Sequence, residues 1–256
     1  MRRINKDLAD IPATLVVSED QLTHQRRKEL IRQGKYIDEQ KYNSRYKTDD
    51  IKEKLDALYH HKCAFCEIRV EQGHVEHYRP KQQYYWLAYS WDNLIYGCPT
   101  CNQFKRTNFE IKGKMAAPPS EADDLSDINT CSSQKNDQQE KPMLLNPERD
   151  NLNGVFLFDM GGHIKDNNND RADYTIRTCN LNREYLVDSR RKIINDFRNK
   201  VISEFLNAET KEVKAKILSF LVEDFINSTN DETHTFTAFR KAAIDWLDDI
   251  VKELVK

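Results

Sequence analysis

The sequence predicts an α+β fold that is mainly helical and has a small metal-binding segment at its centre. Two Cys-x-x-Cys pairs and many aromatic residues lie within residues 63–109. Apolar residues recur at helical spacing before this segment and throughout the last third of the chain. With 256 residues, the chain is long enough to bury a sizeable core. A helical core and a metal site are therefore expected to stabilise the fold together.

Composition narrows the function classes. Charged residues make up 32% of the chain, and the formal net charge is −2. No run of 18 apolar residues is present, so we expect no membrane-spanning segment and no membrane partner. The N-terminal stretch is basic but too interrupted for a signal peptide, which predicts a cytoplasmic protein. Because proteins that bind nucleic acid alone are usually basic, such a function would require a local basic patch or a partner.

The N-terminal unit, residues 1–60, is expected to be an extended arm followed by helices. The arm covers residues 1–20. Helices are predicted over residues 21–34, where Gly34 ends the first, and over residues 48–60. The second has apolar side chains at helical spacing: Ile51, Leu55 and Leu58.

The parts that follow the central segment are a polar insertion and a helical region. Residues 113–142 are polar with prolines near both ends, which favours a long loop or a partly disordered insertion. Residues 143–256 begin with a β-hairpin, because VFLFD and HIKD flank Gly161-Gly162. Amphipathic helices follow. We expect their apolar stripes to complete the core, and their outer face to be available for docking a partner.

The two Cys-x-x-Cys pairs predict a structural zinc site. They are Cys63 with Cys66 and Cys98 with Cys101. In a reducing compartment, such pairs indicate a metal rather than disulfides. Four thiolates on two tight turns make a tetrahedral site that suits Zn²⁺ and leaves no position open for chemistry. The alternatives are buried free thiols or a redox dithiol, and the latter would need a βαβ context that the sequence lacks.

The sequence between and after the pairs contains HVEHYRPK, residues 74–81, and SWDNLIYGCPTCNQFKRTNF, residues 90–109. An acid-His pair, a middle Asn, and an Asn directly after the second cysteine pair resemble the HNH endonuclease family. That family has a ββα-metal module, a β-hairpin followed by a helix, which four cysteines often pin through zinc. The resemblance makes residues 61–112 an HNH nuclease module. It maps the family signature onto Glu76, His77, Asn93 and Asn102.

The resemblance also implies roles for these residues. His77 would be the general base, since imidazole accepts a proton near neutral pH. Asn93 would hold the loop of the module through backbone hydrogen bonds and orient His77. Glu76, where many members carry Asp, and Asn102 would offer oxygen ligands to a catalytic Mg²⁺ or Mn²⁺. Because neighbours on a flat strand point to opposite faces, a bend or bulge is expected at Glu76 and His77.

Basic residues beside these motifs are candidate nucleic-acid contacts. Arg79, Lys81, Lys105 and Arg106 would bind phosphates that flank the cut. The alternative is an ordinary solvated helix face. His74 has three possible roles, as a metal ligand, a substrate contact or a surface residue, and the last two are favoured.

Over most of its length the sequence further resembles the PtuB family, the HNH component of the Septu anti-phage system and of related retron systems. The resemblance rests on CAFCE leading to VEHYRPK, on WDNLIYGCPTCNQFKRTNF, on LLNPERDN, and on CNLNRE before the helical tail. It implies an anti-phage effector nuclease that acts with a PtuA-like ATPase. For retron-linked members it also implies an indirect association with a reverse transcriptase and its DNA.

Several functional alternatives stay open at this point. DNA is the favoured substrate, and RNA such as tRNA is the alternative. The outer face of residues 183–256, together with the arm at residues 1–20, is expected to dock the ATPase. A zinc-stabilised nucleic-acid-binding module without catalysis and a structural adaptor are the two interpretations from other classes.

Overall fold

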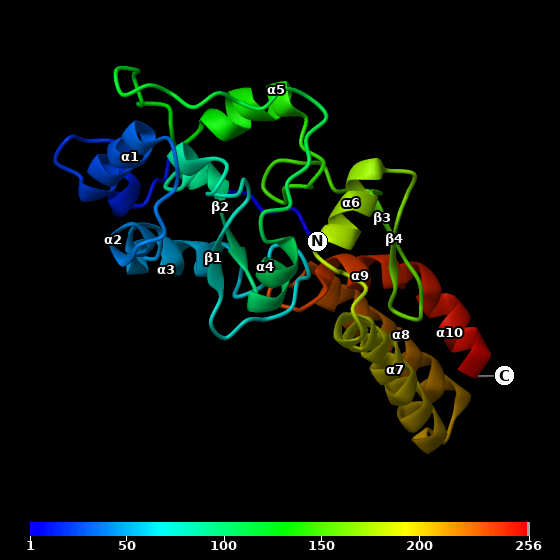
Figure 1. Cartoon of the computed structure of the whole chain (residues 1–256). Helices are drawn as coiled ribbons and strands as arrows, with labels where there is room; N and C mark the ends of the chain where they lie inside the picture. Colours follow the sequence, from blue (N-terminus) through cyan, green and yellow to red (C-terminus); the bar gives the residue numbers. More distant parts are fainter. Residues whose placement is uncertain (255–256) are drawn as a thin grey trace.

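The computed structural model describes residues 1–254, and helices dominate this part of the chain (Figure 1). One end of the molecule holds the N-terminal helices and the first sheet, and a bundle of long helices projects from the other end. The helices are α1 (Leu22–Gln33), α2 (Gln40–Asn43), α3 (Asp49–Leu58), α4 (Pro99–Lys105), α5 (Asp137–Glu140), α6 (Asp170–Thr178), α7 (Glu184–Asn207), α8 (Lys211–Asn230), α9 (Thr237–Ala243) and α10 (Leu247–Leu254). The strands are β1 (His74–His77), β2 (Leu94–Gly97), β3 (Phe156–Phe158) and β4 (Ile164–Asp166).

The central segment forms the predicted ββα unit. β1 pairs antiparallel with β2, and the register runs without interruption from His74 opposite Gly97 to His77 opposite Leu94. α4 follows at once, because Cys98 caps it by accepting the Cys101 backbone N–H. The bulge expected at Glu76 and His77 is therefore absent. In the described residues β1 pairs with β2 alone. All four residues of β1, whose side chains alternate between the two faces of the strand, line one cavity.

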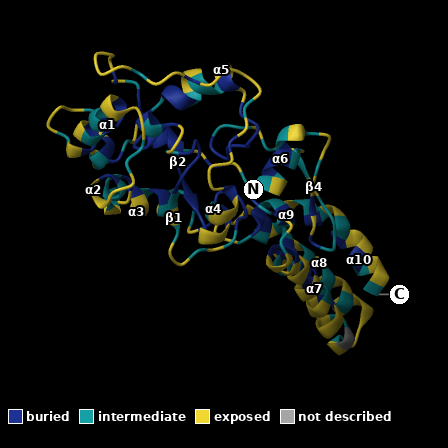
Figure 2. Cartoon of the chain, in the orientation of Figure 1, coloured by how far each residue is buried: buried dark blue, intermediate teal, exposed yellow. Residues whose placement is uncertain are grey.

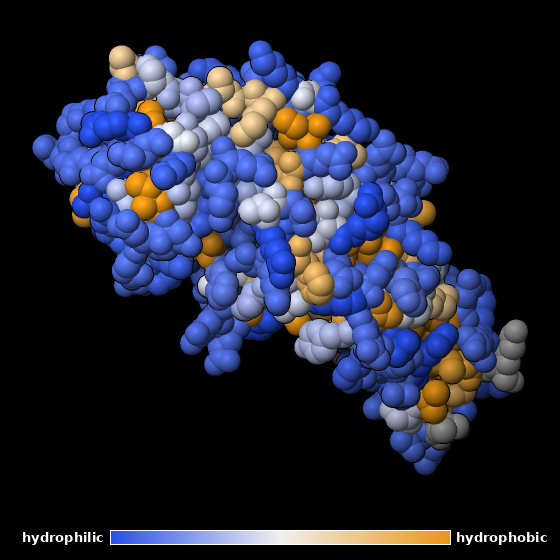
Figure 3. All heavy atoms as spheres, viewed as in Figure 1, coloured by the Kyte–Doolittle hydropathy of each residue, from blue (hydrophilic) through white to orange (hydrophobic). Residues whose placement is uncertain are grey.

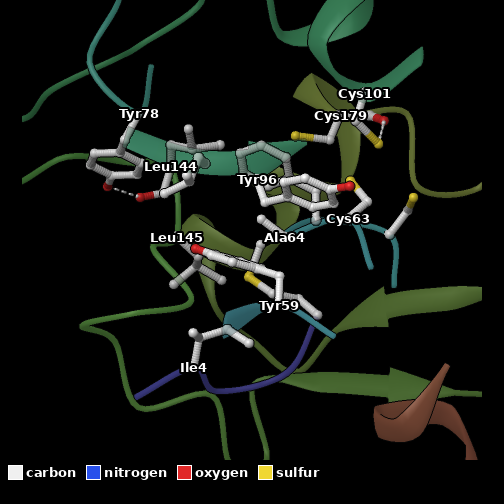
Figure 4. Packing of buried hydrophobic residues seen from close by; sticks show 14 of the residues in the cluster. Ile4, Tyr59, Cys63, Ala64, Tyr78, Tyr96, Cys101, Leu144, Leu145 and Cys179 are labelled. Carbon is white, nitrogen blue, oxygen red and sulfur yellow. Dashed lines mark hydrogen bonds between the residues drawn. The ribbon is translucent and has the colours of Figure 1, made fainter. Parts of the chain in front are cut away.

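The core is centred on this unit. Figure 2 shows buried residues concentrated around β1, β2 and α4. Figure 4 shows Tyr59, Tyr96 and Leu145 packed beside the cysteines, with Ile4 of the N-terminal arm on the same cluster. The arm is thus part of the core, and Lys6 donates to the backbone oxygen of Trp91 at 2.9 Å. The expectation that the arm docks a partner is wrong for these buried residues, because their apolar side chains are already covered.

Residues 113–142 form a long, mostly irregular segment that packs onto the core, as the loop alternative predicts and unlike a disordered insertion. Leu125 and Ile128 are buried, and a short helical turn leads into α5. At the end of α5, Glu140 is fully buried and accepts from Arg79 at 2.7 Å. Removing either partner of such a pair would leave a buried charge uncompensated. This ion pair and the two apolar anchors hold the segment in place in spite of its polar composition.

The C-terminal region follows the prediction of a hairpin and amphipathic helices. β3 and β4 form the antiparallel hairpin. The apolar stripes meet inside the bundle, where the rings of Phe197 in α7 and Phe225 in α8 lie 5.4 Å apart. Some large apolar side chains stay outside, such as Tyr185 at 63% and Phe220 at 66% exposure. Figure 3 shows apolar patches over this bundle, with others at the top and left of the view, on a mainly hydrophilic surface. Within residues 1–254, no helix combines the length and apolarity that crossing a bilayer requires.

Candidate active site and metal centre

The four paired cysteines form one compact cluster. Cys63, Cys66, Cys98 and Cys101 are buried, and their sulfur atoms all lie within 4.8 Å of one another. A tetrahedral Zn²⁺ with bonds of about 2.3 Å separates its sulfur ligands by about 3.8 Å. The distance between the sulfurs of Cys66 and Cys98 is 3.8 Å. Hydrogen bonds among the thiols lower the pKa of Cys98 and Cys66, whereas burial raises the pKa of Cys63 and hydrogen bonds to the other thiols raise that of Cys101. This donor set fits the predicted structural zinc.

His77 is held at the end of β1 by one hydrogen bond and one ring contact. Its Nε2 lies 3.0 Å from the backbone oxygen of Ala88. A carbonyl oxygen only accepts, so the proton lies on Nε2 and the lone pair on Nδ1. The ring of Tyr46 meets the imidazole edge to face at 4.5 Å. Burial lowers the pKa of His77 to about 3, which keeps the imidazole neutral near pH 7. The ring is thus neutral and fixed in orientation, but a pKa this far below 7 makes it a weak base until a nearby negative charge raises that pKa.

Asn93 connects the two ends of the loop that follows β1. Its side-chain oxygen accepts the Arg79 backbone N–H at 2.8 Å. Its amide nitrogen donates to the backbone oxygens of Arg79 at 3.1 Å and Leu87 at 3.2 Å. Leu87 is next to Ala88, the residue that holds His77. The geometry thus gives Asn93 the contacts expected for a residue that orients His77 through the backbone.

Glu76 and Asn102 line the same cavity and bring oxygen ligands to it. One carboxylate oxygen of Glu76, Oε1, accepts from Lys105 at 2.8 Å. Lys105 also donates to the backbone oxygen of His77 at 2.7 Å, so α4 is tied to β1 beside the site. Oε2 and the Asn102 amide oxygen are hard donors of the kind that Mg²⁺ and Mn²⁺ prefer. Both side chains thus offer oxygen atoms to the cavity, and Lys105 holds the carboxylate in place.

A cavity of about 580 Å³ is lined by these groups. All four residues of β1 line it. The other lining residues come from the turn before β1, the segment after β1, the end of α4 and the N-terminal unit: Gly73, Pro80, Lys81, Gln82, Asn102, Arg106, Thr107, Tyr46, Lys47 and Lys52. Glu76 is its single carboxylate among the described residues, and Lys105 neutralises it. The cavity is therefore suited to an anionic ligand.

The five basic residues predicted to contact nucleic acid divide into two groups. His74, Lys81 and Arg106 line the cavity, where they can meet a phosphate. Arg79 and Lys105 are fully buried in ion pairs, with Asp137 and Glu140 in one case and with Glu76 in the other. The phosphate role expected for Arg79 and Lys105 is therefore corrected to a structural one. The sequence shows that both residues are basic, but their acidic partners are brought beside them only when the chain folds.

The central segment matches a known family. Residues 63–108 match the family model described as HNH endonuclease. The matched part contains the four cysteines, β1, β2 and α4, so the chain carries an HNH endonuclease domain at its centre.

A larger part of the chain is similar to proteins named Septu protein PtuB. The one from Bacillus mycoides (strain KBAB4) is 27% identical over 168 residues, which cover 58% of this chain and 52% of that protein. The one from Bacillus thuringiensis is 31% identical over 111 residues, which cover 42% of this chain and 38% of that protein. The chain therefore matches about half or less of the length of these relatives.

Proposed function

We propose that this chain is a metal-dependent nuclease that hydrolyses phosphodiester bonds, DNA foremost, as an effector of defence against phage. The observation that carries the proposal is the placement of His77: a neutral imidazole with a defined base nitrogen, in a cation-lined cavity of an HNH domain. The similarity to Septu protein PtuB supports the role in defence.

The catalytic step follows from the orientation of His77. Nδ1 takes a proton from the attacking water while Nε2–H stays on the backbone oxygen of Ala88. A bound phosphate brings negative charge to a ring whose pKa burial has lowered, and so stabilises the imidazolium that forms. Lys81 and Arg106 bind phosphate oxygens from the cavity. Glu76 and Asn102 would hold Mg²⁺ or Mn²⁺, which supplies charge stabilisation of the scissile phosphate and the leaving oxygen.

The partner that we propose is a PtuA-like ATPase, bound by the outer face of the α7–α10 bundle. Large apolar side chains such as Tyr185 and Phe220 are exposed there. The chain has a net charge of −2, so any positively charged surface is confined to local patches. A chain with this net charge attracts nucleic acid only weakly, and a partner that binds long nucleic acid would supply the missing affinity for it.

A cleavage assay tests the proposal. The purified chain, alone and with its co-expressed ATPase, is incubated with DNA and with tRNA in Mg²⁺, Mn²⁺ or EDTA. We expect cleavage that requires a divalent ion and is faster with the ATPase, with DNA cut in preference to tRNA. A folded, zinc-loaded protein that cuts neither polymer under any of these conditions would contradict a catalytic role and favour the adaptor.

A further inference from the structure

We propose that residues 36–52, which lie outside the HNH domain, form a second wall of the active-site cavity and bind phosphates on one side of the scissile bond. The inference rests on the proposed nuclease function and deepens it. Lys47 and Lys52 line the cavity together with Tyr46. Nothing in the cysteine or histidine motifs points to these residues, because they come from the N-terminal helices.

This wall is fixed to the catalytic strand. α3, which carries Lys52, packs against β1 and β2. Tyr46 is buried, and its ring contacts the imidazole of His77. A phosphate bound by Lys47 or Lys52 would thus lie at a defined position relative to the base, as hydrolysis requires.

Lys81 connects the two walls. Its ammonium donates to the side-chain oxygen of Asn43 at 2.9 Å and to the Tyr46 hydroxyl at 2.8 Å. It also lies 4.2 Å from the ring centroid of Tyr36. The N-terminal residues therefore position a cation of the HNH domain. The cavity is thus lined by Lys47 and Lys52 from the N-terminal unit and by Lys81 and Arg106 from the HNH domain.

The arrangement of these charges suits a polyanion better than a single small anion. Lys47, Lys52, Lys81 and Arg106 are spread over the cavity, and its carboxylate is already paired. A nucleic-acid strand presents one phosphate per nucleotide, so several cations can each meet a phosphate along it. The two walls are thus expected to bind the strand on both sides of the bond that His77 attacks.

Binding of labelled oligonucleotides, measured in a His77→Ala background that prevents cleavage, tests this wall. Lys47→Gln with Lys52→Gln is expected to weaken binding to single- or double-stranded DNA, or to RNA, by about 10-fold or more at low salt. The slope of log affinity against log salt should fall by about 2, one for each lost phosphate contact. The matched control is Lys28→Gln with Lys41→Gln, two N-terminal lysines that do not line the cavity.

The outcomes separate this inference from the proposed function. The proposed phosphate-binding role of residues 36–52 is wrong if the Lys47/Lys52 variant and the control bind nucleic acid equally well. It is also wrong if the parent protein binds no polymer. If the protein cleaves nucleic acid but the Lys47 and Lys52 substitutions do not weaken binding, the nuclease function stands and the role of residues 36–52 fails. If binding depends on these lysines but the protein with His77 intact never cleaves, the role of residues 36–52 stands and the nuclease function fails.

A second inference concerns Arg183, which directly precedes α7. Its NH1 lies 3.5 Å from the sulfur of Cys101, and its NH2 lies 3.5 Å from the sulfur of Cys66 and 4.0 Å from that of Cys98. The guanidinium is oriented by the backbone oxygen of Asn180, which accepts from NH1 at 3.1 Å. One side chain from the C-terminal region thus reaches three of the four cysteines.

We infer that Arg183 couples zinc binding to the attachment of the C-terminal helices. Four thiolates and one Zn²⁺ carry a net charge of −2, and a guanidinium beside them offsets part of it. Hydrogen bonds to ligand atoms of this kind raise metal affinity. When zinc is lost, the sulfur atoms are no longer held together around the guanidinium, and Arg183 loses its anchor at the start of α7.

Zinc release to a chelator and hydrogen exchange test the coupling without any reference to cleavage. Arg183→Met should release zinc about 10-fold faster than the parent. Arg183→Lys, which keeps the charge but cannot reach two sulfurs at once, should fall between them. The matched control is Arg191→Met, an exposed arginine of α7 that pairs with Asp188.

Hydrogen exchange gives a second readout on the unmodified protein. Removal of zinc from the parent should increase exchange in the first turns of α7. Unchanged exchange there, or zinc release from Arg183→Met at the rate of Arg191→Met, would overturn the coupling. If Arg183→Met fails to fold, Arg183→Lys and the unmodified protein still decide the question.

Discussion

Replacing His77 with alanine is expected to reduce the rate of phosphodiester cleavage by about 10²–10⁴-fold, the usual contribution of a general base. The side chain lines the cavity and is fixed by Ala88 and Tyr46. His77→Gln should be equally inactive, although its amide can still donate to the Ala88 oxygen. The measurement is the single-turnover rate on DNA in Mg²⁺, with zinc content and thermal unfolding recorded for each variant.

His74 provides the matched control for this experiment. It lies at the exposed start of β1 and lines the same cavity, three residues from His77. His74→Ala is expected to change the rate by much less, since a substrate contact at the rim contributes to binding rather than to proton transfer. If both His77 variants keep the parent rate while His74→Ala loses it, the base is His74 and the assignment to His77 fails.

The metal centre and the order of the ββα unit could be predicted because their signals are local. Each Cys-x-x-Cys pair fixes two ligands on one turn, and Cys98 caps α4 within the same motif. The role of Asn93 depended on the family resemblance. The structure supplies its hydrogen bonds to the backbone of Arg79 and Leu87. The bulge at Glu76 and His77 was predicted wrongly, because residues of the uninterrupted strand line one cavity although neighbours point to opposite faces.

What the sequence could not show are contacts between distant residues. Arg79 and Lys105 have the charge of phosphate ligands, but Arg79 meets Glu140 and Lys105 meets Glu76 only after folding buries all four. Tyr46 has no motif, yet it holds both His77 and Lys81.

The same holds for Arg183, which is 82 positions from Cys101 in the chain. In residues 113–142, a few buried side chains outweigh a polar composition that is typical of disorder. Sequence patterns therefore predicted the cysteine cluster, and missed distant residues such as Tyr46 and Arg183 that contact the site.

Replacing Cys98 with serine is expected to remove zinc and unfold the HNH domain, with a loss of stability on the order of 10 kcal/mol. The substitution isolates the metal bond. The sulfur of Cys98 accepts the Cys101 backbone N–H at 3.3 Å, and a serine hydroxyl makes the same helix cap. Loss of structure would thus come from the missing ligand and not from a missing cap. Zinc content by metal analysis and unfolding by circular dichroism measure the effect.

Cys131→Ser is the control, because Cys131 is buried but lies outside the cluster and donates only to the backbone oxygen of Ile128. It should keep its zinc. Cleavage should also be lost in Cys98→Ser, even though zinc contacts no substrate. The Ala64 backbone N–H beside the cluster donates to the backbone oxygen of Tyr96 in β2 at 2.8 Å, and β2 pairs with the strand that carries His77. A zinc-free Cys98→Ser protein with the parent's unfolding temperature would show that the metal does not hold the domain together.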